Sequence, residues 1–197
     1  MLFRSAKPLL VGVMRDITLE KQYQDNLQRL SETDSLTGVA NRRKFENLLK
    51  EKWELAARKR HFLSIIMLDV DHFKRFNDSF GHPRGDRCLI MIAEAINRVV
   101  KRTPGMVARY GGEEFVVLAE GDPEQARKTG HRIIREVERL AIPHVPETGN
   151  DRVTVSLGIA SLKPAFETKA VELLQRADSA LYRAKQEGRN RLQVYQE

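Results

Sequence analysis

The chain has 197 residues and a hydrophobic content of 41%, which suffices for one domain of ordinary size plus a short extension. Its single cysteine, Cys88, excludes an internal disulfide framework, and the apolar run around it predicts a core residue rather than a nucleophile. The net charge of +7 suits a polyanionic ligand such as a nucleotide, but aromatic residues make up only 7% of the chain. We therefore expect no nucleic-acid binding.

The sequence has no stretch that approaches the ~20 apolar residues of a membrane-spanning helix, and no signal-peptide core at its N-terminus. We expect a soluble, cytoplasmic polypeptide without membrane contact of its own. Whether a longer chain is tethered to a membrane is left open.

Residues 1–17 contain an apolar stretch, Pro8–Met14, that predicts a strand. A lone strand cannot stand by itself. Followed by Asp16–Thr18 and a charged helix, this stretch resembles the last strand and exit of a PAS sensor domain. We interpret residues 1–17 as such a remnant; the alternative is an N-terminal strand of the main domain.

Residues 18–33 predict a linker helix that Thr18 or Asp16 can cap. Tyr23, Leu27 and Leu30 form a narrow apolar seam between charged residues, which suits a two-stranded coiled coil but is too short to establish one. We favour a dimer-forming linker over a helix that packs back on its own domain.

Residues 34–197 alternate between helix and strand, which predicts an α/β domain with a mixed central sheet flanked by helices. After a turn at 34–38, we expect helices at 42–60, 73–80, 84–100, 123–140 and 169–186, and strands at 62–70, 106–110, 115–118, 153–160 and 192–195. Asn41 can cap the first helix. The second and third strands are joined by Gly111-Gly112 and predict a hairpin.

Two carboxylates come where the apolar strand 62–70 meets a loop. Because side chains alternate along a strand, Asp69 and Asp71 point to the same face. A carboxylate at a buried strand end is costly unless a cation or a donor meets it, which favours a metal ligand. For Asp71 the alternative is a cap on the helix that begins near His72.

A second acidic pair, Glu113-Glu114, follows the glycines of the predicted hairpin. Paired glycines let the backbone come close to a ligand, so phosphates can lie against main-chain N–H groups there. The alternative is an ordinary hairpin turn followed by two glutamates that have no functional role. Two acidic clusters on neighbouring strands favour Mg²⁺ or Mn²⁺ carrying a triphosphate, as in-line attack of a hydroxyl on phosphorus requires.

Several long motifs follow one another along the main domain. They are Asp34–Arg43, Leu68–Lys74, Asn77–His82, Gly85-Asp86, Arg109–Phe115, Ser156–Ala160 and Ala177–Asn190. In these motifs the chain resembles the GGDEF family of diguanylate cyclases, in register over about residues 32–195. The resemblance implies a nucleotidyl-cyclase, palm-like fold and an enzyme that makes cyclic di-GMP from two molecules of GTP.

The resemblance also implies roles for the acidic residues. Asp69, the carbonyl of Val70 and Glu113 would hold two Mg²⁺ or Mn²⁺ ions per GTP, with Glu114 as a further ligand. Glu113 would also act as the base for the ribose 3′-hydroxyl, and Lys74 would stabilise charge on the phosphates in the transition state.

For the base, the resemblance implies that Asn77 and Asp86 bind guanine. An amide and a carboxylate together complement its O6 acceptor and its N1–H and N2–H donors. The other implied substrate-binding residues are Phe73, His82, Gly111, Gly112, Lys185 and Arg189. For Lys74, Lys185 and Arg189 taken singly, the alternative is a solvated surface cation.

Each domain binds one GTP, whereas the product needs two bonds between two nucleotides. The family meets this need with a homodimer, in which each 3′-hydroxyl faces the α-phosphate of the partner's GTP and two pyrophosphates leave. The linker helix is then a plausible place for an upstream sensor to control catalysis.

One departure from the family concerns product inhibition. Many relatives carry an Arg-x-x-Asp motif that grips the product, but here the corresponding residues are Arg102-Thr103-Pro104-Gly105. The loss of the aspartate predicts weak or absent inhibition, although Arg102 with Arg132 could hold product by another geometry.

Three other functions fit parts of the sequence. A catalytically silent relative would bind GTP or cyclic di-GMP and signal by contact, but the signature Gly111–Phe115 is intact. A palm-like cyclase or polymerase with another substrate shares the paired carboxylates, but Asn77 with Asp86 argues for guanine. A pure dimerisation module leaves the acidic clusters without a role.

Overall fold

The computed structural model describes residues 32–145, 149, 151–165 and 168–196, and the predicted PAS remnant and nearly all of the linker helix lie outside them. The elements in chain order are β1 (Ala40–Asn41), α2 (Arg42–Lys59), β2 (Leu63–Val70), α3 (Phe73–Phe80), α4 (His82–Val100), β3 (Gly105–Gly111), β4 (Glu114–Glu120), α5 (Pro123–Glu138), β5 (Val155–Leu162), α6 (Ala170–Gln186) and β6 (Leu192–Val194). None of the described helices is long and apolar enough to cross a membrane.

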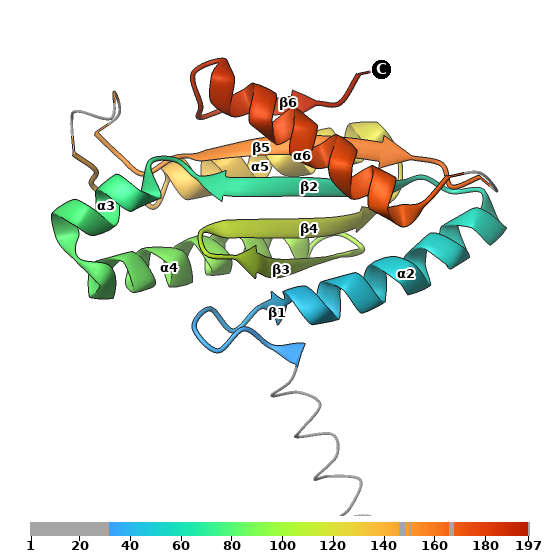
Figure 1. The fold of residues 1–197 in the computed structure, drawn as a ribbon, viewed down its shortest axis with the longest axis horizontal. Helices are drawn as coiled ribbons and strands as arrows, with labels where there is room; N and C mark the ends of the chain where they lie inside the picture. Colours follow the sequence, from blue (N-terminus) through green and yellow to red (C-terminus); the bar gives the residue numbers. More distant parts are fainter. Residues whose placement is uncertain (1–31, 146–148, 150, 166–167, 197) are drawn as a thin grey trace, which may run out of the picture. The chain divides into compact units, whose positions relative to one another are not determined.

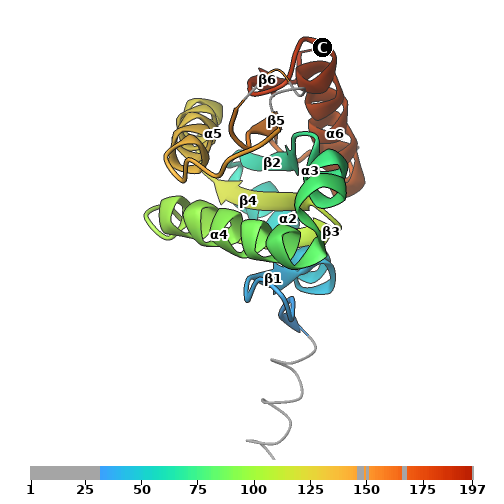
Figure 2. The same cartoon turned by 90° about the vertical axis from the view of Figure 1, so that its left-hand side faces the viewer.

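The strands form one sheet of six in the order β1-β3-β4-β2-β5-β6. β2 runs antiparallel to both β4 and β5, whereas β1 pairs parallel with β3 and β5 parallel with β6. Helices α2 and α6 cover one face of the sheet and α4 and α5 the other, while α3 lies at the end where β2 stops (Figures 1 and 2). The predicted α/β fold with a mixed sheet is confirmed.

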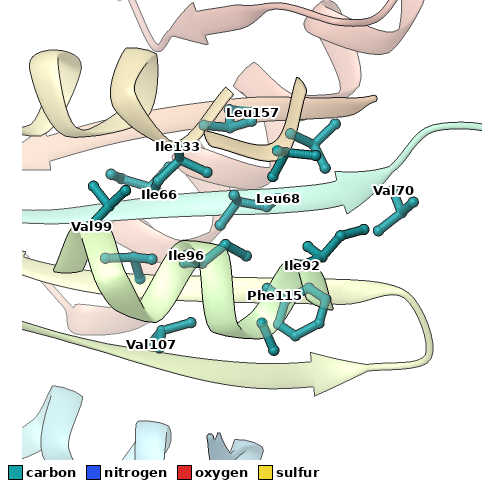
Figure 3. Close-up of a cluster of buried hydrophobic side chains, with 14 of the residues drawn as sticks. Ile66, Leu68, Val70, Ile92, Ile96, Val99, Val107, Phe115, Ile133 and Leu157 are labelled. Atoms are coloured by element: carbon teal, nitrogen blue, oxygen red, sulfur yellow. The ribbon is translucent and has the colours of Figure 1, made fainter. Parts of the chain in front are cut away.

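The central strand β2 supplies side chains to two separate cores. Ile66 and Leu68 point into the core under α4 and α5 (Figure 3), and Ile65 and Met67 point into the core under α2 and α6. Each fully buried aliphatic side chain stabilises the fold by ~1.5–3 kcal/mol. The same alternation sends Asp69 to the face covered by α2 and α6.

Local signals explain the limits of several helices. Asn41 caps α2 as predicted, since its side chain accepts a hydrogen bond from the Lys44 N–H at 3.0 Å. α3 spans the predicted residues, but α4 begins two residues earlier than expected, at His82. Gly81, with φ of +81°, separates the two helices, and Pro83 fits the first turn of the second.

The main differences from expectation concern the strands. β1 is only two residues long, which is too short for hydrophobic alternation to reveal a strand. It is a strand because its residues pair with Ala108 and Arg109. The hairpin turn consists of Gly112 and Glu113, one residue later than the glycine pair, because Gly111 still pairs with Glu114. The turn therefore presents the first glutamate at the hairpin tip.

Candidate active site

The C-terminal end of β2 and the tip of the β3–β4 hairpin lie side by side (Figure 1). Asp69 stands opposite Glu114 in the antiparallel register, and the Val70 N–H donates to the Glu113 carbonyl at 3.4 Å. Gly112 opens the turn with φ of +44°, a conformation that favours glycine. The structure thus places the four residues predicted as metal ligands at neighbouring backbone positions of β2 and the hairpin tip.

Asp69 is the most perturbed carboxylate of this cluster. Its side chain is 12% exposed, and Lys185 Nζ lies 2.8 Å from its Oδ2. Burial, together with the negative charges of Glu113 and Glu114, raises the pKa of Asp69 to about 6, although Lys185 acts to lower it. The contact with Lys185 therefore does not fully offset the cost of burying this carboxylate.

These residues fit a hard divalent cation. The donors are all oxygen atoms, and a cation would offset the cost of ionising the buried Asp69 carboxylate. Within the described ranges, no three His, Cys, Asp or Glu side chains converge closely enough to hold a metal ion by themselves. An open site of this kind suits Mg²⁺, which is usually bound by one or two carboxylates together with substrate phosphates.

Asp71 does not cap α3, because the N-cap is His72, in a left-handed conformation and without a side-chain cap. Instead its buried carboxylate accepts hydrogen bonds from Thr154 Oγ1 at 2.7 Å, Ser156 Oγ at 2.6 Å and the Asn190 N–H at 3.1 Å. Asp71 therefore fastens the loop after α6 to the end of β2. The interpretation as a helix cap is wrong.

The two predicted C-terminal cations lie at the end of α6 and in the turn that follows it. Lys185, in the last turn of α6, reaches Asp69. Arg189 follows in a turn with φ of +61°. Burial lowers the pKa of the His72 imidazole, and the nearby charge of Arg189 lowers it further. Both cations thus lie near the acidic end of β2, on either side of the Asp71 anchor.

The α3–α4 corner brings the predicted base-reading residues together. Asn77 on α3 is half-buried and packs against Gly85, which directly precedes the exposed Asp86 on α4. Phe73 is buried below this corner, with 7% exposure. Lys74 on α3 and His82 at the start of α4 are both exposed. The predicted base-binding residues thus lie together at the α3–α4 corner, beyond the end of β2.

Arg109 is a residue of this site that sequence reasoning missed. Its Nε donates to the Gly112 carbonyl at 2.8 Å, and its Nη1 donates to Asp34 Oδ1 at 3.2 Å. Asp34 also accepts hydrogen bonds from the backbone and side chain of Thr37. The turn before α2 and the hairpin tip are therefore tied together across 75 residues of sequence, a separation that local patterns do not reveal.

A cavity of about 390 Å³ lies between α4 and α5, the helices on the opposite face of the sheet. It brings Arg102 and Arg132 together, as the possible product site requires. Three further arginines line it, Arg98, Arg135 and Arg139. Arg98 precedes Arg102 by four residues, and Arg135 and Arg139 follow Arg132 by three and seven. This spacing was a signal that sequence reasoning did not use.

Known proteins share this combination of fold and sequence. The probable diguanylate cyclase DgcC of Escherichia coli is 34% identical over 189 residues, which cover 95% of this chain and 50% of that protein. A diguanylate cyclase of Vibrio cholerae is 34% identical over 188 residues, 95% of this chain and 57% of that protein. The chain thus spans about half the length of the curated relatives that it matches.

Solved structures give the same result. The coiled coil and GGDEF domain of DgcB from Caulobacter crescentus, in complex with c-di-GMP, superposes with a TM-score of 0.81 at 32% identity and covers 91% of this chain and 93% of that chain. The active GGEEF domain of a Vibrio cholerae diguanylate cyclase gives 0.68 at 32% identity, with 81% and 99% covered. The model of the diguanylate cyclase GGDEF domain matches residues 31–191, and the chain belongs to that family.

Proposed function

We propose that this chain condenses two molecules of GTP into one cyclic di-GMP and two pyrophosphates. The observation that carries the proposal is the pairing of Asp69 with Glu114 beside the hairpin tip, where burial and like charge raise the pKa of Asp69. The relatives named above are diguanylate cyclases, and one of them has the same Gly-Gly-Glu-Glu-Phe signature in its name. Asn77 and Asp86 at the neighbouring corner support guanine as the base.

Asp69, the Val70 carbonyl, Glu113 and Glu114 would hold Mg²⁺ or Mn²⁺, two ions per GTP. A bound ion supplies charge neutralisation on the triphosphate and lowers the pKa of an attacking hydroxyl. Glu113, at the tip of the hairpin, accepts the proton of the ribose 3′-hydroxyl. Because Glu113 is a turn residue rather than a strand residue, it lies at the outermost point of the hairpin, toward a partner domain.

The cations act on the phosphates. Lys74 on α3 and Arg189 after α6 stabilise the negative charge that develops as the 3′-oxygen bonds to the α-phosphorus and pyrophosphate departs. Lys185 stays with Asp69 and positions it. Phe73 forms the floor of the base pocket and His82 its outer wall, while Gly111 and Gly112 leave room for the phosphates.

The reaction needs two such domains, since each contributes one GTP. A homodimer presents each 3′-hydroxyl to the α-phosphate of the partner's nucleotide and gains rate through proximity. In the proposed organisation, residues 34–197 form the cyclase domain and residues 18–33 form a linker helix that pairs two chains, as this need requires. Residues 1–17 are the end of a PAS sensor domain.

The decisive experiment is incubation of the purified chain with GTP and Mg²⁺, with chromatography for cyclic di-GMP and pyrophosphate in a ratio of one to two. Glu113→Gln is expected to abolish the product. Glu120→Gln, at the other end of β4, removes a carboxylate that pairs with Lys52 and serves as the matched control with full activity. Product from Glu113→Gln at the wild-type rate would contradict the catalytic assignment.

Two further outcomes separate the alternatives. A wild-type chain that binds GTP tightly but yields no product, even at concentrations that favour dimers, indicates a silent signalling module instead. For an active chain, the rate per molecule must fall on dilution, because two domains meet to form each product. A rate per molecule that stays constant down to the monomeric range contradicts the two-domain mechanism.

A further inference from the structure

Gly85 lies where α4 meets α3, directly against the side chain of Asn77. A β-carbon at position 85 would lie 1.9 Å from Asn77 Oδ1, 3.0 Å from Asn77 Cγ and 3.3 Å from Phe73 Cζ, whereas Cβ atoms essentially never come closer than 3.0 Å to a neighbour. Gly85 is helical and does not have a positive φ. The glycine is therefore required by the space that Asn77 occupies and not by its backbone conformation.

The amide of Asn77 is held there by packing. Its Oδ1 is buried and has no hydrogen-bond partner among the residues that the structure describes. A buried amide oxygen without a donor costs free energy, so packing against α4, and not a hydrogen bond, holds the amide in this position. Asp86 follows Gly85 directly, so the helix contact that seats the amide also fixes its distance from the carboxylate.

We propose that Gly85 is a positioning residue for guanine recognition. Its missing side chain lets the Asn77 amide lie against α4, beside Asp86, where both groups meet the base. Gly85 acts through Asn77 and does not itself touch the nucleotide. The inference rests on the proposed function, because it takes GTP as the ligand that Asn77 reads.

Gly85→Ala separates this role from a role in folding. Alanine is a better helix former than glycine, and the amide that it displaces is the end of a flexible side chain that can rotate away. We expect a folded protein whose thermal midpoint equals or exceeds that of the wild type. Affinity for GTP falls about tenfold, the size of one lost hydrogen bond, while affinity for ATP does not change.

A double-mutant cycle tests whether the effect passes through Asn77. With Asn77→Ala already in place, Gly85→Ala is expected to change GTP affinity by less than about twofold. Gly130→Ala is the matched control, because a β-carbon on this buried helical glycine of α5 would meet Leu192 Cδ1 at 2.3 Å, away from the base-reading pair. It is expected to lower the thermal midpoint and leave GTP affinity unchanged.

Affinities are measured by calorimetric titration with GTP and ATP in Mg²⁺, in a Glu113→Gln background so that GTP is not consumed. In the active chain, the same change is expected in KM and not in kcat. The inference is overturned if Gly85→Ala keeps the wild-type affinity for GTP. It is also overturned if Gly85→Ala lowers GTP affinity equally in the presence of Asn77 and in the Asn77→Ala background. Tight GTP binding without any product from the wild type overturns the proposed function alone.

Folding of the variants is the remaining control. If Gly85→Ala does not fold, the double variant with Asn77→Ala lacks the contact with the amide and is expected to fold. Failure of both variants means that the structure itself requires Gly85, and this too overturns the inference.

Discussion

Gly158 and Leu181 are in direct contact through their backbones, so β5 and α6 meet without a side chain between them. A β-carbon on Gly158 would lie 2.1 Å from the Leu181 nitrogen and 2.2 Å from the Ala177 carbonyl oxygen. This close approach sets the distance of α6 from the sheet. Lys185 is one helical turn beyond Leu181, and its contact with Asp69 on β2 depends on that distance.

Gly158→Ala is therefore expected to destabilise the fold and to slow catalysis. Because main-chain atoms cannot swing aside, α6 must move away from the sheet, at a cost of ~2 kcal/mol or more. Urea unfolding measures the first effect and GTP turnover the second. Gly130→Ala, which meets a movable leucine side chain, is expected to cost less. A Gly158→Ala variant with wild-type stability would contradict the backbone contact.

The Arg109–Asp34 pair predicts a different kind of defect. Both side chains are mostly shielded, with 17% and 21% exposure, and Arg109 also holds the Gly112 carbonyl. Arg109→Ala is expected to release the hairpin tip and lower kcat at least about tenfold, with a loss of only ~1–2 kcal/mol in stability. Asp34→Asn, which leaves the bond to Gly112, is expected to have a smaller effect.

The matched control for this pair is Arg127→Ala. Its ion pair with Glu124 is half exposed on both sides, and such pairs contribute little. We expect wild-type kcat and stability from this variant. If Arg127→Ala lowered kcat as much as Arg109→Ala does, the hairpin tie could not be the cause.

The order of helices and strands was predictable because hydrophobic periodicity and caps act over short distances. Asn41 marked the start of α2 correctly, and the apolar run of β2 indicated a central strand. β1 was missed because its two residues owe their pairing to β3. The onset of α4 was placed too late because a glycine at positive φ can separate two helices without an intervening loop.

The site was predictable where it consists of residues close in sequence. The acidic hairpin and the strand end at Asp69 are local motifs. The donors to Asp71 and the pairing of Arg109 with Asp34 were not predictable, because these partners come from segments 75 to 119 residues away. Burial of the Asp71 carboxylate forces it to find donors, but periodicity does not tell which donors the fold supplies.

His144 predicts that the fold weakens in acid. It is buried with 6% exposure, with its ring edge against Phe76, and its Nδ1 accepts the Val145 N–H at 2.7 Å. Burial lowers the pKa of His144 below its ordinary value; the backbone of His72 opposes this shift and the charge of Arg75 adds to it. The unfolded chain therefore binds this proton more readily, so stability is full above about pH 6.5 and decreases as the pH falls below it.

Unfolding in urea between pH 7.5 and pH 5 measures this dependence, over the range where histidine ordinarily titrates, ~6.5. His144→Asn keeps an acceptor for Val145 and cannot become charged, so its stability is expected to vary less with pH than that of the wild type. His131→Asn, on the exposed side of α5, is the control and is expected to keep the wild-type dependence. An identical pH dependence in His144→Asn would contradict the assignment.

We predict weak product inhibition from the replacement of the family's aspartate by Gly105. A β-carbon there would lie 2.8 Å from the Leu118 carbonyl oxygen, so β3 has no room for the missing aspartate without a shift. The arginines of the α4–α5 cavity can hold phosphates, but its one lining carboxylate, Glu136, is engaged by Arg139. No other side chain that lines the cavity can accept the N1–H and N2–H donors of guanine. We expect low micromolar cyclic di-GMP to leave the initial rate of GTP turnover above half of its uninhibited value. We expect Arg102→Ala to leave this inhibition unchanged. Half-inhibition of the wild type in this range, relieved in Arg102→Ala, would contradict the prediction.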